Sequence, residues 1–162
     1  MENLQNFQKI LFGIGSNLGD KNLNIFNAID KLKNYLSLKN IKISTIYKNP
    51  AMLPPQAPIE WNKEFYNIAI SADIDLENFN PLKILEIIKK IEKEIGRKDS
   101  ERWAPREIDI DILLIDEIFI AEKNILTIPH EGLFNRDFFY KTVEEIEPKL
   151  LEKIRKKIKK FN

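Results

Sequence analysis

The chain has 162 residues, of which 43% are hydrophobic, and its formal net charge is +1 at pH 7. This length and composition predict one globular domain, residues 1–162, and the balanced charge does not favour nucleic-acid binding across the whole surface. The sequence contains no cysteine, which excludes disulfides, thiolate zinc sites and a cysteine nucleophile.

No apolar run approaches the ~20 residues of a transmembrane helix, and the N-terminal segment lacks the apolar stretch of a signal peptide. We therefore expect a cytoplasmic protein without a membrane partner. The charge is unevenly distributed, because residues 149–162 contain seven basic residues and one acidic residue.

Residues 9–15 predict a first strand that ends in glycines. Asp20 then suits the N-cap of a helix whose apolar residues recur at helical spacing, namely Ile25, Phe26, Ile29, Leu32 and Leu36. This order suggests a dinucleotide-binding unit, but the spacing Gly13-x-Gly15-x-x-x-Gly19 has one residue too many. A Walker A loop is absent too, so a bound nucleotide would need a different binding device.

A long proline-rich segment separates the next two predicted strands. Residues 41–47 alternate as the second strand, and residues 49–61 contain four prolines. Such a long loop within a domain is functional or mobile. We expect it to close over a ligand because it carries several apolar residues, namely Met52, Leu53, Ile59 and Trp61.

Residues 64–73 predict the third strand, on which Phe65, Asn67 and Ala69 share one face. Asn67 is the polar residue of that face. Two interpretations of it remain open, a satisfied structural side chain or a contact to a ligand.

The second helix is predicted to start at Asn80 and Pro81 and to end at Gly96. Its apolar residues fall in one stripe, which contains Ile84, Leu85, Ile88, Ile91 and Ile95. Glu92 falls within the same stripe. Its carboxylate either faces inward, where it needs a partner, or extends past the edge of the stripe into solvent.

Three acids, Glu107, Asp109 and Asp111, alternate with isoleucines before the apolar run 112–115. This pattern predicts a strand on which the three carboxylates share a face, with neighbours ~6.5 Å apart. The row is either the solvated face of an antiparallel sheet or part of a covered sheet, where unpaired charge is costly.

The irregular segment 97–106, which leads into this strand, is rich in cations and carries Arg97, Lys98, Arg102, Trp103 and Arg106. Aspartates at the spacing of Asp109 and Asp111 suit hard cations such as Mg²⁺. Arginines beside a metal-binding acid pair indicate a polyphosphate ligand.

The C-terminal third begins with a predicted hairpin or meander over residues 116–127, followed by a helical region with Asn135, Arg136, Phe138 and Phe139. His130, the only histidine, is either structural or a phosphate ligand. Residues 149–162 predict a basic amphipathic helix. We expect it to dock on its own domain, and attachment to a membrane or a nucleic acid is the alternative.

Several motifs follow one another along the chain: Gly15-Ser16-Asn17-Leu18-Gly19, Tyr47-x-x-Pro50, Phe65-x-Asn67, Ile91-Glu92-x-x-x-Gly96-Arg97, Arg102-Trp103-x-Pro105-Arg106-x-Ile108-Asp109-Ile110-Asp111-Ile112-Leu113 and Pro129-His130. In order and approximate spacing they resemble the 6-hydroxymethyl-7,8-dihydropterin pyrophosphokinases of the folate pathway. The resemblance covers residues 9–148, and the arginine–aspartate motif is its most specific part.

The resemblance implies an α+β fold, a ferredoxin-like two-layer sandwich with helices packed on a mainly antiparallel sheet, to which the C-terminal helix is added. It implies transfer of pyrophosphate from ATP to the hydroxymethyl group of the pterin, which releases AMP. ATP is the co-substrate, two Mg²⁺ ions are the cofactors, and a monomer with no nucleic-acid partner is expected.

The resemblance also implies roles for individual residues. Asp109 and Asp111 would hold the metals and, with Arg97 and Arg106, carry the catalysis. The ATP site would contain Glu92, Arg97, Trp103, Arg106, Ile112, Thr127, His130 and Arg136. The pterin site would contain Pro50, Met52, Phe65, Asn67 and Phe138.

The chain departs from the family pattern at a few positions. Phe65 stands where a tyrosine is frequent, Lys89 replaces a glutamine, and Glu131 follows His130 where an aromatic residue or proline is common. The second loop arginine of the family is represented either by Lys98 or by no residue. The alternatives to this function are a non-catalytic ferredoxin-like module that binds RNA through its basic tail and a different phosphotransferase on the same fold.

Overall fold

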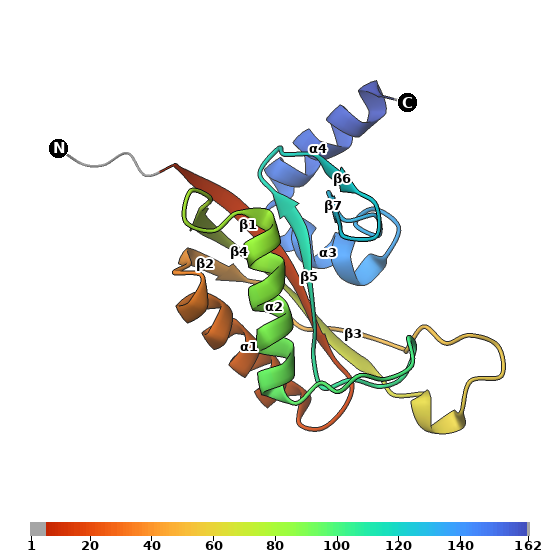
Figure 1. Ribbon diagram of the computed structural model, residues 1–162. Helices are drawn as coiled ribbons and strands as arrows, with labels where there is room; N and C mark the ends of the chain where they lie inside the picture. Colours follow the sequence, from red (N-terminus) through yellow and green to blue (C-terminus); the bar gives the residue numbers. More distant parts are fainter. Residues whose placement is uncertain (1–5, 162) are drawn as a thin grey trace.

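Five strands of one antiparallel sheet organise the protein, whose computed structural model describes residues 6–161 (Figure 1). The elements follow in the order β1 (Phe7–Ser16), α1 (Lys21–Tyr35), β2 (Lys39–Ile43), β3 (Tyr47–Asn49), η1 (Ile59–Trp61), β4 (Phe65–Asp75), α2 (Pro81–Ile95), β5 (Asp109–Ile115), β6 (Ile120–Glu122), β7 (Leu126–Ile128), α3 (Asp137–Ile146) and α4 (Pro148–Lys160). The sheet order is β2-β4-β1-β5, and β3 also pairs with β4. This is the expected ferredoxin-like α+β arrangement.

Side chains that alternate along the central strands build a different core on each face of the sheet. On the first face, Ile10, Phe12 and Ile14 of β1 pack with residues of α1 and α2. On the second face, Leu11 and Leu113 pack with residues of α3 and α4. Figure 1 shows the two helix pairs on opposite sides of the sheet, so helices contribute to both faces.

The predicted helix ends are confirmed. The Asp20 side chain accepts a hydrogen bond from the Leu23 amide at 3.1 Å and caps α1. The Asn80 side chain accepts one from the Lys83 amide at 2.9 Å and caps α2. Gly96 ends α2 with φ of 117°, a conformation that is strained for other residues.

The strand predicted over residues 41–47 is wrong in its extent, because β2 ends at Ile43 and β3 begins at Tyr47. Glu145 of α3 accepts hydrogen bonds from the Thr45 amide at 3.0 Å and from the Thr45 hydroxyl at 2.9 Å. The amide that would continue the strand is therefore bound to a helix, a contact between residues 100 positions apart.

Two further boundaries differ from those predicted. β5 begins at Asp109, so Glu107 precedes the strand and the row on it contains two carboxylates rather than three. α3 begins at Asp137, so Asn135 and Arg136 lie before the helix, in and next to turns. The hairpin expected within residues 116–127 is confirmed, since β6 and β7 pair antiparallel.

The predicted C-terminal helix is present as α4 and docks on the rest of the chain. Leu151 and Ile154 are buried against α3, and Lys157 forms an ion pair with Glu117 at 3.2 Å. Its outward face carries exposed lysines, among them Lys149, Lys153 and Lys156. Within residues 6–161 no helix is long and apolar enough to cross a membrane.

Candidate active site

The candidate site lies on the second face of the sheet, beyond the area that α3 and α4 cover. The register of the three central strands places Gly15 of β1 opposite Asn67 of β4 on one side and opposite Asp109 of β5 on the other. Gly13 lies opposite Asp111 in the same way. Residues from three distant parts of the sequence therefore form one polar surface.

Two glycines make room for this surface. A Cβ atom on Gly15 would lie 2.5 Å from the Asn67 Oδ1, and one on Gly13 would lie 2.7 Å from the Phe139 ring. Both distances are far below ordinary contact, so a larger residue at either position would have to displace the Asn67 amide or the Phe139 ring. The sequence suggested that the glycines end the first strand, but β1 continues through both to Ser16.

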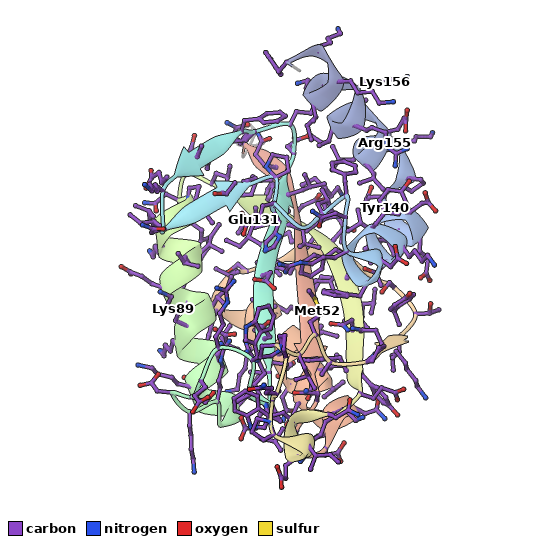
Figure 2. All side chains as sticks on the ribbon, turned by 90° about the vertical axis from the view of Figure 1, so that its right-hand side faces the viewer. Met52, Lys89, Glu131, Tyr140, Arg155 and Lys156 are labelled. Atoms are coloured by element: carbon purple, nitrogen blue, oxygen red, sulfur yellow. The ribbon has the colours of Figure 1, made fainter. Side chains whose placement is uncertain are left out.

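A first cavity of about 200 Å³ is lined by Asn67 and by both aspartates of β5. It brings together four of the five residues predicted for the pterin, namely Met52, Phe65, Asn67 and Phe138. Met52 comes from the proline-rich loop and lies over the middle of the sheet in Figure 2. Pro50 is not part of this lining, and its carbonyl accepts a hydrogen bond from the Asn49 side chain at 3.0 Å.

A second cavity of about 330 Å³ lies along β5, between α2 and the β6–β7 hairpin. Its lining contains three of the residues predicted for ATP, namely Ile112, Thr127 and His130. Leu85, Ile110 and Leu126 give it an apolar wall. Asp111 lines both this cavity and the first.

A third cavity of about 230 Å³ is formed by the cationic segment before β5 and contains Arg97, Arg102 and Arg106. Arg102 and Arg106 also line the first cavity, together with Trp103 and Arg136. The structure thus places Arg136, which the resemblance assigned to ATP, beside the residues assigned to the pterin.

Asp109 carries a charge that the structure balances with two arginines. Its Oδ1 lies 3.0 Å from Arg97 Nη1 and its Oδ2 lies 3.7 Å from Arg106 Nη1. Burial and then the neighbouring Asp111 raise the pKa of Asp109, and the two arginines oppose this rise. A cation at the acid pair would relieve the same repulsion.

Glu92 faces inward, as one of the two interpretations of its helix stripe required. It is 9% exposed, accepts a hydrogen bond from the Ile110 amide at 3.1 Å, and pairs with Arg97 Nη1 at 2.5 Å. Burial raises the pKa of Glu92 to about 7 against the attraction of Arg97, and Asp109 adds to the rise. Glu92 thus lies behind the site and holds Arg97 next to Asp109.

His130 is fixed by its own loop at the edge of β5. Its amide donates to the Leu113 carbonyl at 2.9 Å, and its Nδ1 accepts from the Gly132 amide at 2.9 Å. The Nε2 atom lies 3.7 Å from Asp111 Oδ1. Because Nδ1 is an acceptor, a neutral His130 carries its proton on Nε2, which faces the acid pair.

Asn17 is an important residue that the sequence did not single out. It is 4% exposed, and its Oδ1 accepts from the Arg106 amide at 2.9 Å while its Nδ2 donates to the Lys63 carbonyl at 3.2 Å. Its amide also donates to the Arg106 carbonyl at 3.2 Å. The buried side chain of Asn17 therefore connects the end of the proline-rich loop, at Lys63, with the end of the cationic segment, at Arg106.

We expect Asn17→Ala to lower kcat/KM about tenfold or more and to reduce the free energy of unfolding by about 1–3 kcal/mol, because the Arg106 amide and the Lys63 carbonyl lose a buried partner. Steady-state kinetics and urea unfolding measure the two effects. Asn24→Ala is a matched control near the same turn, since Asn24 hydrogen-bonds the Leu18 carbonyl but neither loop. Equal kinetics in the two variants would contradict the role of Asn17.

Other residues of the first cavity were also missed. Asn49 lines it and accepts a short hydrogen bond from the Asn67 amide group. Phe139 lines it from α3. The position of Asn49 follows from the pairing of β3 with β4, which places Asn49 opposite Phe65. No local pattern in the sequence indicates this register.

Asp109 and Asp111 suit Mg²⁺ by their chemistry. Both supply carboxylate oxygens from the same face of one strand, and the pKa of Asp109 is raised by burial first and then by the charge of Asp111, which a cation would neutralise. Among residues 6–161 no group of three or more histidine, aspartate or glutamate side chains is placed to hold a metal. Mg²⁺ commonly takes its remaining ligands from phosphates and water, so two carboxylates fit.

Comparison with known proteins gives a family of pyrophosphokinases, which agrees with a site of paired acids and arginines. A family model for 7,8-dihydro-6-hydroxymethylpterin-pyrophosphokinase (HPPK) matches residues 11–148. The chain is 42% identical over 153 residues to a 2-amino-4-hydroxy-6-hydroxymethyldihydropteridine pyrophosphokinase of Aquifex aeolicus (strain VF5), a match that covers 94% of this chain and 89% of that relative. It is 34% identical over 134 residues to the protein of the same name in Bacillus subtilis (strain 168), covering 82% and 74%.

A solved structure of an HPPK-DHPS in complex with substrates is similar in fold. The TM-score is 0.65 at 14% sequence identity, and the match covers 96% of this chain and 44% of that chain. This chain therefore spans less than half of the larger protein, and at such an identity the likeness concerns the fold alone.

Proposed function

The chain belongs to the 7,8-dihydro-6-hydroxymethylpterin-pyrophosphokinase family, and from this premise we propose which of its residues bind each substrate and which act in catalysis. The enzyme transfers pyrophosphate from ATP to the hydroxymethyl group of 6-hydroxymethyl-7,8-dihydropterin, a step of folate synthesis. Membership of an enzyme family favours this function over a non-catalytic binding module.

The observation that carries the proposal is the shared wall of the two cavities at Asp111. The first cavity has the aromatic and amide groups that a flat, polar heterocycle needs, with Phe65 and Phe138 for its faces and Asn67 for its edge. The second has an apolar wall for a purine and His130 near its polar end. The hydroxymethyl group and the phosphates would meet beside Asp111, which lines both cavities.

In the reaction the pterin hydroxyl oxygen forms a bond to the β-phosphorus of ATP. The bond from that phosphorus to the oxygen bridging to the α-phosphate breaks, AMP leaves with the bonding electrons, and the hydroxyl proton is released. This chemistry depends on alignment and on neutralised charge rather than on a covalent intermediate. Arg97 and Arg106, which face Asp109, supply fixed positive charge beside the phosphates.

The proposed nucleotide contacts are Ile112 and Thr127 along the second cavity, His130 at its end, and Trp103 and Arg136 in the lining of the first. Glu92 acts through Arg97, which it holds by an ion pair. Met52, with Pro50 before it, brings the proline-rich loop toward the pterin. When bound between Asp109 and Asp111, two Mg²⁺ ions would neutralise charge on the triphosphate.

Incubation with ATP, Mg²⁺ and 6-hydroxymethyl-7,8-dihydropterin tests the proposal. We expect pterin-dependent AMP with no ADP, whereas ADP formation would indicate a different phosphotransferase. A titration with Mg²⁺ of the enzyme bound to a non-hydrolysable ATP analogue, read by calorimetry, should show two ions per chain. A single ion would contradict the two-metal proposal and leave the reaction intact.

We further propose that the enzyme acts as a cytoplasmic monomer that binds no nucleic acid. Residues of one chain line both cavities, so the site needs no second copy. A chain without cysteines is suited to a reducing compartment that supplies ATP. RNA affinity that is lost when the lysines of α4 are replaced would contradict the nucleic-acid part of this proposal.

A further inference from the structure

We propose that Arg155 is a positioning residue for ATP, although its helix lies outside the part of the chain that the family model matches. The match ends at residue 148, where α4 begins. Arg155 contacts the segment 130–136, which carries His130 at one end and Arg136 at the other. The inference rests on the proposed phosphate roles of these two residues and adds a function for the C-terminal helix.

Arg155 connects three parts of the structure through one guanidinium group. Its central carbon lies 5.1 Å from the centre of the Tyr140 ring and 5.6 Å from the centre of the Phe134 ring. It also donates a short hydrogen bond to the Tyr140 hydroxyl. Figure 2 shows Arg155 and Tyr140 next to each other on α4 and α3, while Lys156 points away from this contact.

Phe134 belongs to the segment 130–136, so its contact with Arg155 connects α4 to the two candidate phosphate ligands, His130 and Arg136. The centres of the Phe134 and Tyr140 rings lie 6.2 Å apart, so Phe134, Tyr140 of α3 and Arg155 form one cluster. Within the segment, the Leu133 amide donates to the His130 carbonyl and the Arg136 amide donates to the Gly132 carbonyl, both at 3.0 Å. Movement of Phe134 would therefore be shared by both ends of the segment.

Arg155 is not needed to hold α4 in place. Leu151 and Ile154 bury the inner face of the helix, and the ion pair of Lys157 with Glu117 lies on its other flank. α3 is anchored separately by the buried Phe139 and Val143. Loss of Arg155 should therefore loosen the segment 130–136 rather than unfold a helix.

The test compares Arg155→Ala with the wild type for each substrate. We expect the KM for ATP to rise about three- to tenfold, the range for loss of a cation–aromatic contact at a partly exposed site, while the KM for the pterin and kcat change less than about twofold. Arg155→Lys should restore part of the ATP affinity, because a lysine keeps the cation but loses the planar fork. Lys157→Ala is the matched control on the same helix and should leave both KM values unchanged.

Direct titration with a non-hydrolysable ATP analogue gives a second readout that does not require turnover. If the wild type formed no pterin-dependent AMP, the proposed function would fail, and this titration would still decide whether Arg155 sets nucleotide affinity. An unchanged affinity for the analogue in Arg155→Ala would overturn the inference. So would equal losses for both substrates together with a lower melting temperature, since that result would reflect general destabilisation.

Discussion

Replacing either aspartate of β5 with asparagine, Asp109→Asn or Asp111→Asn, is expected to lower kcat about a thousandfold, because an amide cannot supply the charge that Mg²⁺ requires. Asparagine keeps the size of the side chain and a polar oxygen, so the fold should survive. Loss of the Asp109 charge also removes the ion pair to Arg106 and leaves Arg97 with Glu92 as its anionic partner. Rapid-quench assays of AMP formation, with circular dichroism to check folding, measure the effect.

Glu107→Gln provides the matched control for these variants, because Glu107 is an acid of the same segment that precedes β5. We expect its activity to stay within about twofold of the wild type. Partial recovery of Asp111→Asn at high Mg²⁺ concentration would support a weakened metal site. Wild-type turnover in either aspartate variant would show that the metals are held elsewhere.

Gly15→Ala is expected to raise the KM for the pterin about 30- to 100-fold with little change for ATP, because the new methyl group displaces the Asn67 amide and about two hydrogen bonds proposed between this amide and the pterin are lost. The Cβ would lie 2.5 Å from Asn67 Oδ1. No other group lies as close, since the next is the Phe65 ring at 3.5 Å. The effect should therefore be confined to the pterin side of the site.

The double variant Gly15→Ala/Asn67→Ala tests this mechanism. If the methyl group acts only by displacing Asn67, the double variant should bind the pterin as weakly as Asn67→Ala alone, so the two effects should not add. Additive losses would show that Gly15→Ala distorts the strand itself. Titration of each variant with the pterin substrate, followed by its fluorescence, gives the four affinities needed.

Local patterns in the sequence predicted those parts of the fold that neighbouring residues determine. The apolar stripe of α2, with Glu92 inside it, and the caps at Asn80 and Gly96 are all present. The alternation of acids with isoleucines over residues 107–111 predicted Asp109 and Asp111 on one face of a strand, as found. Each of these features depends on residues within one or two turns of a helix or on the two-residue repeat of a strand.

The features that the sequence did not reveal depend on contacts between distant residues. The break between β2 and β3 depends on Glu145, and the place of Asn49 in the first cavity depends on its register with Phe65. The role of Gly15 was also hidden. A glycine that leaves space for Asn67 looks the same in a sequence as one that makes a turn.

For the site residues too, the sequence identified the members of the site but not all of their contacts. The resemblance to a known family supplied the candidate roles, and the structure brings most of those residues to the walls of three neighbouring cavities. Glu92 proved to lie behind Arg97 rather than in a cavity wall, and Arg136 lies beside the residues that we propose for the pterin. A motif identifies which residues belong to a site, whereas their exact neighbours depend on how loops and strands pack.

The central position of β1 has a consequence for how the enzyme is made. β1 leaves the ribosome first, but its partners β4 and β5 end at residues 75 and 115. At ~5–20 residues per second, about 2–8 seconds separate these two strands, and during this time one edge of β1 has no neighbour. The pairing of β1 with the strand of Asn67 can therefore form on the nascent chain before the aspartates of β5 have been synthesised, whereas the first cavity is completed only when Phe138 has followed them.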